Sequence, residues 1–256
     1  MITYFSAVIR LYKNMTKVKN TASLIGELSV FFPAYNEEKN IEKTVEDCIA
    51  ILNEITPKWE VVIVDDGSRD NTGKISQRLA DKYKGLVKVI THSPNRGYGG
   101  ALKSGLYGCK YNWIAFTDSD GQFDFGEIYH FIDTAKTQSA DLVIGYRIKR
   151  EDPPLRIAIA NMLKVWNFIF YGSRFKDADC GFKLVKKEVV DKIPPLQTES
   201  AITETEFLIR AKKAGFKIVE IGVRHFPRKE GSQTGGNPKV ILKAAKESIN
   251  LWKALH

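Results

Sequence analysis

The chain of 256 residues is poor in cysteine and has no long apolar run. Its three cysteines, Cys48, Cys109 and Cys180, are far apart and form no Cys-x-x-Cys pair. Such spacing disfavours a disulfide framework and a zinc site, and it fits a reducing cytoplasm. No window approaches about eighteen consecutive apolar residues, the length that spans a bilayer. The N-terminal "YFSAVIRLY" is too short to span and has no small-residue cleavage site, so we expect any membrane association to be peripheral.

The sequence also contains no internal repeat and no low-complexity linker. Hydrophobic residues make up 43% of it, and its mean hydropathy is -0.24. This composition is that of a globular protein able to bury a sizeable core, which argues against disordered and fibrous classes. At this length we expect one core with extensions.

Positive charge is in excess but is not evenly spread. The formal net charge is +9, and the basic residues concentrate at 1–20, 145–176 and 228–256. Surfaces of this kind attract nucleic acid, anionic lipid or phosphorylated substrates. The charge alone does not choose among these three partners.

Short apolar runs alternate with helical patterns through the first 145 residues. The predicted strands are 28–32, 60–64, 86–90, 113–117 and 141–145. The predicted helices are 41–52, 72–84, 97–110 and 126–138. This alternation predicts an α/β fold with a mostly parallel sheet and crossover helices.

After residue 145 the regularity weakens. A basic loop leads to an amphipathic segment at 157–171, whose apolar face fits either the core or an acceptor or membrane surface. A helix is predicted at 203–214, a strand near 217–226 and a final helix from Pro238. The apolar face of that final helix is predicted to consist of Ile241, Ala245, Ile249, Trp252 and Leu255.

Polar side chains directly follow the first two strands. In "FFPAYNEE" the backbone around Asn36 lies at the carboxyl end of a parallel strand, where open α/β sheets bind ligands. The alternative is the start of a helix with Asn36 as its N-cap. In "VVIVDDGS" the adjacent carboxylates of Asp65 and Asp66 are tolerable if one accepts hydrogen bonds from a ligand while the other caps the turn. An ordinary Asp-Gly turn is the alternative there.

The segment "NRGYGGALKSG" follows the third strand and is rich in glycine. Gly97, Gly99 and Gly100 stand at a predicted helix start, where glycine lets the backbone approach a ligand or another element closely. The pattern superficially suggests dinucleotide binding, but that fingerprint should follow the first strand. We therefore reject a Rossmann dinucleotide site.

The strand at 113–117 ends in Asp118-Ser119-Asp120. A turn beginning at Asp118 can bring both carboxylates toward one point, and a divalent cation would offset their repulsion. All-oxygen ligation fits Mg²⁺ or Mn²⁺ better than zinc, and Gln122 could add a carbonyl oxygen. The alternative is a solvated acidic turn with caps, and Asp124 is predicted to cap the helix that follows.

Further charged residues are candidates for phosphate or proton chemistry. The cations that could face a diphosphate are Arg147, Lys149, Arg150, Arg156, Arg174, Arg224, Arg228 and Lys229. His92 and His225 have no nucleophile-base pattern around them, so a structural role is favoured. Glu204 and Glu206 open a predicted helix, either as first-turn acids or as hydrogen-bonding partners of a sugar or an acceptor.

Seven motifs occur in one order along the chain. They are "FPAYNEE", "VVIVDDGSRDNT", "NRGYGGALKSG", "FTDSDGQFD", "GYR", "DADCGFK" and "HFPRKEGSQTG". This arrangement resembles the family 2 glycosyltransferases of GT-A fold, and within them the polyprenyl-phosphate sugar synthases similar to dolichyl-phosphate mannose synthase. The resemblance covers about residues 27 to 237.

The resemblance implies a single GT-A domain with a Rossmann-like, mostly parallel central sheet flanked by helices. Its nucleotide-sugar half would be 27–145 and its acceptor half 146–237. A basic extension at 1–26 would precede the domain, and a C-terminal amphipathic helix at 238–256 would follow it.

The resemblance also implies roles for individual residues. The nucleotide-binding residues would be Pro33, Ala34, Tyr35, Glu37, Asp65, Asp66, Asp118, Ser119 and Asp120. Asp118 and Asp120, the ends of a DXD motif, would bind the metal, with Gln122 as a third ligand. Arg147 and Arg228 are similar to arginines that contact the diphosphate or the acceptor phosphate. Arg156 is a weaker match, and Gln233 stands where the dolichyl-type pattern has a lysine.

By this resemblance, the expected reaction is inverting transfer of a hexose from a GDP- or UDP-sugar to a polyprenyl phosphate such as dolichyl or undecaprenyl phosphate. Mg²⁺ or Mn²⁺ is the expected cofactor. The expected location is the cytoplasmic face of a membrane, held peripherally, with a homo-oligomer or a membrane-anchored protein as a further partner and no nucleic acid. A phosphate acceptor is already ionised near neutral pH, so no strong general base is required.

Three alternative functions stay open. A family 2 enzyme acting on a saccharide hydroxyl would need a carboxylate base, for which Asp177, Asp179 and Glu206 are candidates. A nucleotidyltransferase shares the metal and nucleotide requirements. A non-enzymatic basic module would bind membranes or nucleic acid, but it would not need a buried strand that ends in carboxylates.

Overall fold

The computed structural model describes residues 24–149, 154–228, 230–231 and 238–255. The basic N-terminal extension, up to residue 23, therefore lies outside the described residues. So do Arg150, Lys229, Gln233 and the side chains of Arg156 and Ile241. Across the described ranges, no helix is both long and apolar enough to cross a membrane.

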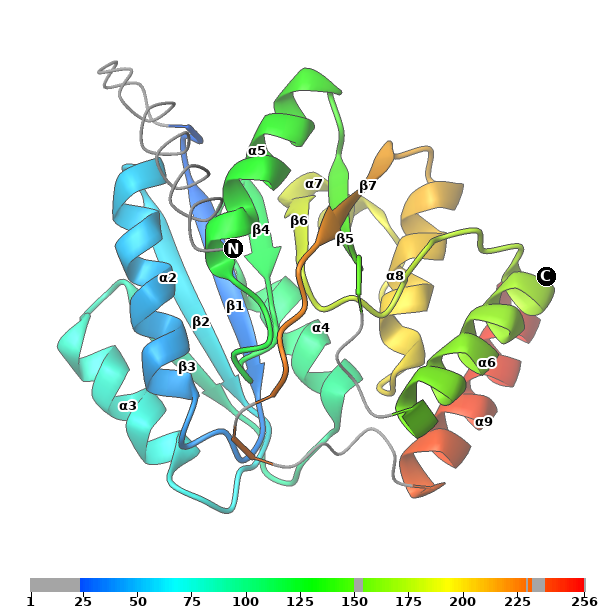
Figure 1. The fold of residues 1–256 in the computed structure, drawn as a ribbon, viewed down its shortest axis with the longest axis horizontal. Coiled ribbons are helices and arrows are strands. Elements are labelled where there is room, and N and C mark those ends of the chain that lie inside the picture. Colours follow the sequence, from blue (N-terminus) through cyan, green and yellow to red (C-terminus); the bar gives the residue numbers. More distant parts are fainter. Residues whose placement is uncertain (1–23, 150–153, 229, 232–237, 256) are drawn as a thin grey trace, which may run out of the picture.

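In the described residues, seven strands form one sheet in the order β3-β2-β1-β4-β6-β5-β7. They are β1 (Leu28–Ala34), β2 (Trp59–Asp65), β3 (Val87–Thr91), β4 (Trp113–Phe116), β5 (Leu142–Arg147), β6 (Lys183–Lys186) and β7 (Ile218–Val223). All neighbouring pairs are parallel except those that β6 makes with β4 and β5. The sheet is thus mostly parallel, as predicted, and the carboxyl ends of β1 and β2 lie at the lower edge of the molecule in Figure 1.

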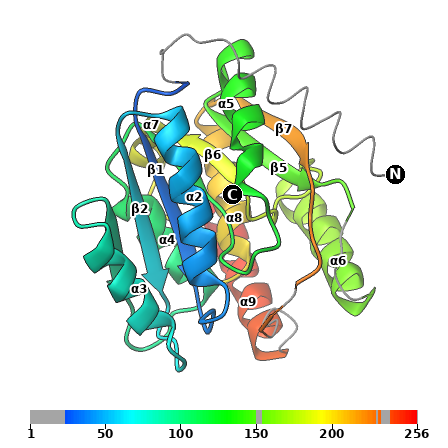
Figure 2. The same cartoon turned by 60° about the vertical axis from the view of Figure 1, so that its left-hand side comes forward.

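Helices cover both faces of this sheet. One face packs against α2 (Ile41–Ile55), α3 (Thr72–Lys82) and α5 (Ile128–Thr137), the last preceded by the short η1 (Phe125–Glu127). The other face packs against α4 (Tyr98–Gly108), α7 (Lys187–Lys192) and α8 (Ile202–Lys213). Beyond α8 lie α6 (Pro154–Tyr171) and α9 (Pro238–Leu255), which share a small apolar cluster with it. Figures 1 and 2 place α6 on the side of the molecule opposite α3.

The strands and helices predicted in the first 145 residues all occur, with ends shifted by no more than three residues. β1 and β2 are buried along their whole length because helices cover both of their faces, which explains their unbroken apolar runs. Two elements of the second half, β6 and α7, are not predicted by the sequence. β6 has four residues and includes Lys183 and Lys186, so it shows no apolar run.

The predicted apolar face of the C-terminal helix is wrong at Ile249 and Trp252, whereas Leu255 packs against the small apolar cluster as predicted. Ile249 and Trp252 are 42% and 40% exposed. Among the side chains of α9 that the structure describes, the buried ones are Ala244, Ser248 and Leu251. Ser248 faces inward because Trp166 Nε1 donates to its hydroxyl at 2.7 Å and Tyr171 Oη donates to its carbonyl at 2.6 Å. Hydrogen bonds to α6 therefore turn a polar residue inward and leave apolar residues at the surface.

Close packing of α4 on the sheet depends on a glycine. A Cβ at Gly105 would lie 2.1 Å from a ring carbon of Phe31. The Phe31 ring is fully buried and stacks on Phe116 with ring centroids 4.8 Å apart. Because the interior is densely packed, the ring has little room to move aside. Gly105 therefore sets the distance between α4 and β1.

We predict that Gly105→Ala lowers the free energy of unfolding by about 1–3 kcal/mol, the usual cost of overpacking a core. The measurement is urea unfolding followed by circular dichroism. Gly26→Ala is the control, because a Cβ at Gly26 would meet no atom within 4 Å. Equal unfolding midpoints for the two variants would contradict the close contact between α4 and β1.

Candidate active site

The loops after β1 and β2 are joined by hydrogen bonds into one structure. Asn36 N donates to Ser68 Oγ at 3.0 Å, and Glu37 N donates to Thr72 Oγ1 at 2.7 Å. These bonds cross from one loop to the other at the carboxyl edge of the sheet. The residues expected in a nucleotide pocket, Pro33, Ala34, Tyr35 and Glu37, belong to this structure.

Asn36 does not act as a helix N-cap. The helix α2 begins at Ile41, and Asn36 has a φ of 56°, in the left-handed region. Its Oδ1 accepts a hydrogen bond from Arg69 N at 2.8 Å. The alternative interpretation of this segment as a helix start is therefore wrong, because Asn36 shapes a loop instead.

The adjacent aspartates at the end of β2 are stabilised by different loops. Asp65 Oδ1 accepts from Ser68 N at 3.0 Å and so caps its own turn. Asp66 accepts from Arg96 N at 2.9 Å and from Gly97 N at 2.8 Å. Separate N–H donors offset the repulsion between the two carboxylates. Asp66 thereby fixes the glycine-rich loop in front of α4.

His92 is part of the same support. It is 7% exposed, with Nδ1 lying 2.6 Å from Asp66 Oδ1 and Nε2 lying 2.8 Å from Ser104 Oγ. Both ring nitrogens thus have protein partners, in agreement with the structural role favoured from the sequence.

The Asp118-Ser119-Asp120 turn lies beside these loops. Ser119 is 3% exposed, and its hydroxyl donates to Pro33 O at 2.7 Å, which ties the end of β4 to the end of β1. Asp118 Oδ1 accepts from Tyr98 Oη at 3.2 Å. The two carboxylates of the turn therefore lie where the loops after β1, β3 and β4 meet.

Arg228 reaches this turn from the segment after β7. Its Nη1 lies 3.2 Å from Asp120 Oδ2, and its Nη2 lies 2.5 Å from Glu37 Oε1. The segment is held by Gln122, whose Nε2 donates to Phe226 O at 2.9 Å while Phe226 N donates to Gln122 O at 2.9 Å. The segments that follow β1 and β7 are thus joined at the end of β4.

Asp120 has a clearly perturbed pKa. Burial, followed by the negative charge of Asp118, raises the pKa of Asp120 to about 7. The N–H of Gln122 and the guanidinium of Arg228 oppose this shift. An additional positive partner would stabilise the ionised form of a carboxylate in this environment near neutral pH.

The donor set of this turn fits a magnesium or manganese ion. It consists of the oxygens of Asp118 and Asp120, the ligand type that such hard cations prefer. In the part of the chain that the structure describes, no three His, Cys, Asp or Glu side chains converge as a complete metal site. Mg²⁺ typically takes one or two carboxylates and completes its shell with water and substrate phosphates. The two carboxylates therefore match a cation that is bound together with a phosphorylated ligand.

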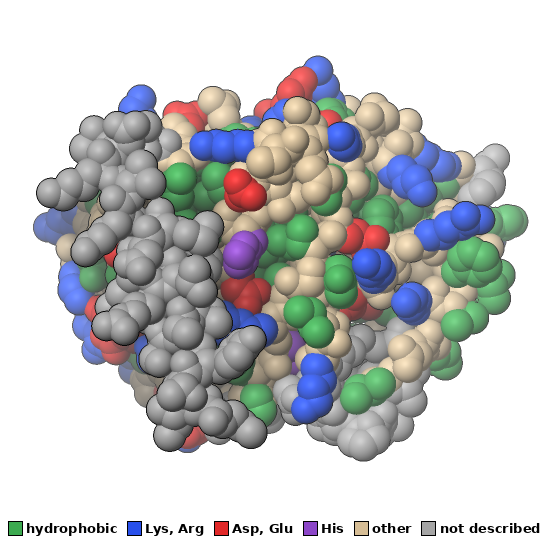
Figure 3. Space-filling view, turned by 45° about the horizontal axis from the view of Figure 1, so that its top comes forward, with side chains coloured by type: hydrophobic (Ala, Val, Ile, Leu, Met, Phe, Trp, Pro, Cys, Tyr) green, Lys and Arg blue, Asp and Glu red, His purple; other side chains and the backbone are tan. Residues whose placement is uncertain are grey.

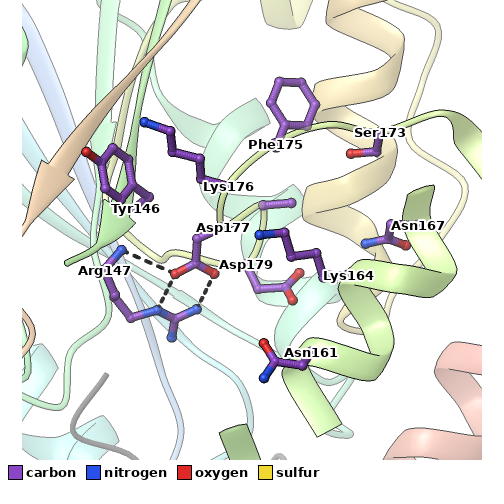
Figure 4. Close-up of a pocket in the computed structure, with 11 residues that line it drawn as sticks. Tyr146, Arg147, Asn161, Lys164, Asn167, Ser173, Phe175, Lys176, Asp177 and Asp179 are labelled. Carbon is purple, nitrogen blue, oxygen red and sulfur yellow. Dashed lines mark hydrogen bonds and ion pairs between the residues drawn. The ribbon is translucent and has the colours of Figure 1, made fainter. Parts of the chain in front are cut away.

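A second polar region lies between β5, α6 and residues 173–179, around a cavity of about 110 Å³ (Figure 4). On one wall, Arg147 Nε and Nη2 donate to the two oxygens of Asp177 at 2.6 and 2.7 Å. The opposite wall is α6, with Asn161, Lys164 and Asn167. Asn167 is 3% exposed, and its Oδ1 has no hydrogen-bond partner among the described residues. The cavity therefore offers both charge and an unused amide atom to a ligand.

Residues 177–181 connect the cavity to the Asp118 turn. Asp177 lines the cavity, and a Cβ at Gly181 would lie only 2.5 Å from Asp118 Oδ2. The regions expected to bind the donor and the acceptor are therefore adjacent along one short stretch of backbone.

Glu206 is bonded to α8 and to the loop in front of it. It is fully buried, and its Oε2 accepts from Thr198 N at 2.9 Å and from Thr198 Oγ1 at 2.7 Å. Its Oε1 accepts from Gln197 N at 2.9 Å and from Arg210 Nε at 2.7 Å. These bonds hold the loop in front of α8, and this geometry favours a structural role over that of a base.

Glu204, two residues earlier, points to the Asp118 turn through Tyr98. The Tyr98 hydroxyl donates to Glu204 Oε1 at 2.5 Å, and Lys183 pairs with the other oxygen. Burial raises the pKa of Glu204 to about 7, against the opposing charge of Lys183. The sequence did not single out Tyr98 or Lys183, since one lies within a glycine-rich run and the other within a basic one. Lys183 lies inside a strand and is 0% exposed. A lysine buried in this way requires a partner of opposite charge.

Comparison with known proteins gives the family. Residues 29–193 match the family described as "Glycosyl transferase family 2". A dolichyl-phosphate beta-glucosyltransferase of Saccharomyces cerevisiae is 35% identical over 219 residues, which cover 77% of this chain and 66% of that protein. The chain belongs to glycosyl transferase family 2. The resemblance inferred from the order of the motifs is thereby confirmed.

This chain covers different shares of two further relatives. A dolichyl-phosphate beta-glucosyltransferase of Dictyostelium discoideum is 31% identical, over 77% of this chain and 65% of that protein. The chain thus spans just under two thirds of the yeast and Dictyostelium proteins. An uncharacterized protein of Methanocaldococcus jannaschii is 32% identical, over 85% of this chain and 95% of that protein.

Solved structures give the fold of this family 2 chain. A structure of glucosyl-3-phosphoglycerate synthase from Mycobacterium tuberculosis with Mn²⁺, UDP and glucosyl-3-phosphoglycerate superposes with a TM-score of 0.66 at 17% identity, covering 90% of this chain and 79% of that one. A structure of the same enzyme with Mg²⁺ and UDP has a TM-score of 0.64 at 19% identity, with the same coverage. The predicted GT-A fold is confirmed.

We predict that Asp120→Asn flattens the pH dependence of stability in the presence of a chelator. The pKa of Asp120 in the folded protein, about 7, lies above the value of 3.8 usual for an aspartate. Its contribution to stability is therefore complete below about pH 4 and is lost as the pH rises through about 7. Between pH 5 and pH 8 the unmodified protein should lose up to about 3 kcal/mol more than the variant. Urea unfolding at both pH values measures this difference, and parallel losses would contradict it.

Proposed function

We propose that this protein is a metal-dependent, inverting glycosyltransferase that moves a hexose from a nucleoside diphosphate sugar to a polyprenyl phosphate. The observation that carries the proposal is the meeting of Asp120, Glu37 and Arg228 at the end of β4, beside a cationic cavity in the second half of the domain. Relatives named dolichyl-phosphate beta-glucosyltransferase support a polyprenyl phosphate acceptor and favour glucose as the sugar. The M. tuberculosis enzyme, crystallised with UDP-glucose, makes that donor the first to test.

The donor fits the joined loops at the carboxyl edge of the sheet. The nucleoside would lie along residues 33–37, with Asp65 near its base or ribose. The diphosphate would lie at Asp118 and Asp120 and face Arg228, whose guanidinium can form two parallel hydrogen bonds to phosphate oxygens. A bound Mg²⁺ or Mn²⁺ would neutralise the charge that develops on the leaving diphosphate. Arg228 would add to that stabilisation as the bond to the sugar breaks.

The acceptor phosphate fits the cavity between β5 and α6. Three basic side chains line it, namely Arg147, Lys164 and Lys176. Arg147 is held in a fixed orientation by its two hydrogen bonds to Asp177. From the cavity, a phosphate oxygen can attack the anomeric carbon on the face opposite the leaving diphosphate, which inverts the configuration.

Two of the three carboxylates that could serve a hydroxyl acceptor as a base are bonded to other groups, and the third, Asp179, lines the cavity. Asp177 is bound on both oxygens by Arg147, and Glu206 is bound by Arg210 and by the loop before α8. A phosphate is already ionised near neutral pH and needs no such base. The bonds of Asp177 and Glu206 therefore favour a phosphate acceptor over a saccharide hydroxyl that would use either of them as its base.

We predict that the protein transfers radiolabelled glucose from UDP-glucose to a short polyprenyl phosphate, so that the label is extracted into organic solvent. GDP-mannose and a saccharide acceptor are tested in parallel. Asp118→Asn should lower the turnover at least about 100-fold, because it removes a carboxylate that would hold the cation by which the leaving diphosphate is stabilised. Added chelator should have a comparable effect.

Asp133→Asn is the matched control, because Asp133 is an exposed aspartate on α5. It should retain the activity of the unmodified protein. If the label stays in the aqueous phase on a saccharide, the acceptor is a saccharide hydroxyl and not a lipid phosphate. If no donor is transferred or hydrolysed and no nucleoside diphosphate binds with Mn²⁺, the proposed function is wrong.

The surface of α6 and α9 fits contact with a lipid bilayer. The exposed apolar residues there include Met162, Val165, Phe168, Ile169, Leu242, Ile249 and Trp252. Lysines at 164, 243, 246 and 253 lie on the same two helices. Figure 3 shows apolar side chains among basic ones along the right-hand edge, the side on which α6 and α9 lie in Figure 1. Such a mixed apolar and basic surface binds anionic interfaces, which would bring the adjacent cavity close to lipid phosphates.

We predict that the protein sediments with vesicles containing phosphatidylserine and that the double variant Phe168→Ser, Ile169→Ser sediments less, by about tenfold or more in the partition coefficient. The two side chains are 53% and 69% exposed, so their replacement costs the fold little. Leu86→Ser is the control, because Leu86 is 40% exposed just before β3, away from α6. Equal sedimentation of all three proteins would exclude this surface as the docking site.

A further inference from the structure

A cluster next to Asp118, in which Tyr98 is 38% exposed and its partners Glu204 and Lys183 are buried, has no part in the reaction outlined above. Tyr98, at the start of α4, places its hydroxyl 3.2 Å from Asp118 Oδ1 and 2.5 Å from Glu204 Oε1. Lys183 of β6 pairs with Glu204 Oε2 and also donates to Cys180 O. Glu204 and Lys183 are 2% and 0% exposed. Tyr98 therefore joins the Asp118 carboxylate to a salt bridge in the interior.

Two close approaches of the backbone build this cluster. A Cβ at Gly99 would lie 2.1 Å from Thr203 Oγ1, so the first turn of α4 lies directly on the first turn of α8. A Cβ at Gly181 would lie 2.5 to 2.7 Å from the carboxylate atoms of Asp118, so that carboxylate packs against bare backbone. Both contacts exclude larger residues and hold the members of the cluster in reach of one another.

The Tyr98 hydroxyl has one proton to donate and lies within hydrogen-bonding distance of both Asp118 Oδ1 and Glu204 Oε1. Lys183 supplies the positive charge that Glu204 needs in the interior. The single O–H of Tyr98 thus lies between two carboxylates, one fixed by the lysine and the other at the edge of the site.

We propose that Tyr98 is a positioning residue that, anchored by Glu204 and Lys183, holds the Asp118 carboxylate in the orientation that binds the divalent cation. This inference rests on the proposed function. A carboxylate that can rotate loses conformational freedom when it binds a cation, whereas a carboxylate that is already oriented does not. Removing the hydroxyl should therefore weaken cation binding and leave the fold in place.

The test measures the affinity of the Tyr98→Phe variant for Mn²⁺. Electron paramagnetic resonance monitors the binding in the presence of saturating UDP. The apparent Kd for Mn²⁺ should rise about 3- to 10-fold, the effect of losing one hydrogen bond to an oriented carboxylate. In the transfer assay, the variant should need a correspondingly higher Mn²⁺ concentration for half-maximal rate and should recover most of its kcat when Mn²⁺ is saturating. A role confined to packing would not move the Mn²⁺ requirement separately from kcat.

Tyr107→Phe is the matched control on the same helix. The Tyr107 hydroxyl accepts a hydrogen bond from Leu196 N at 3.0 Å, so this variant also loses one phenol hydrogen bond. It should bind Mn²⁺ within twofold of the unmodified protein. Equal Mn²⁺ affinities for the Tyr98 and Tyr107 variants would overturn the inference while the proposed function stands. Failure of the unmodified protein to bind Mn²⁺ with UDP would overturn both.

Glu204→Gln tests whether the anchor acts through Tyr98. It should raise the Kd for Mn²⁺ in the unmodified background and have little further effect in the Tyr98→Phe background, since residues that act in series are not additive. Equal effects in both backgrounds would show that Glu204 influences the cation independently of Tyr98, against the inference.

Discussion

The crowding of negative charge at the end of β4 is the constraint on which the geometry of the site depends. Asp118 and Asp120 stand two residues apart after a buried strand, and burial together with Asp118 raises the pKa of Asp120 to about 7. Groups from distant parts of the chain compensate for this cost. Arg228 comes from the segment after β7, and Tyr98 comes from the start of α4. The sheet places these loops at one edge, and their interactions with the turn then hold them in contact.

Much of the fold could be predicted because its information is local. Unbroken apolar runs marked the strands covered by helices on both faces, and polar residues at the ends of those runs marked the carboxyl edge of the sheet. The same reasoning assigned Asp124, whose side chain accepts from Gly126 N as the cap of η1. The second half was harder to predict, since β6 is short and antiparallel and contains the buried Lys183. A strand that contains a buried charged residue lacks the apolar pattern by which strands are predicted, and the charge is explained only when its partner is known.

Partners distant in sequence were beyond prediction. Arg228 meets Glu37 across 191 positions, and the pair of Arg147 with Asp177 spans 30. Both arginines were expected to contact phosphate, but no pattern in the sequence indicated that each already has a carboxylate. The prediction for the apolar face of α9 was wrong in part for a related reason, because hydrogen bonds from α6 bury Ser248. By contrast, the different roles of Glu204 and Glu206 follow from helix geometry, since residues two apart on a helix point to opposite sides.

The balance of charge around the turn bears on how a diphosphate could bind there. Asp118, Asp120 and Glu37 are three carboxylates, and Arg228 is the cation that contacts two of them. A nucleoside diphosphate would bring further negative charge into a site that already holds an excess of it, and Coulomb repulsion would oppose its binding. The site favours the diphosphate if positive charge arrives with it, and oxygen ligands select a hard divalent cation for that task. The electrostatics of the described residues thus argue that a phosphorylated donor would bind at this turn together with a cation.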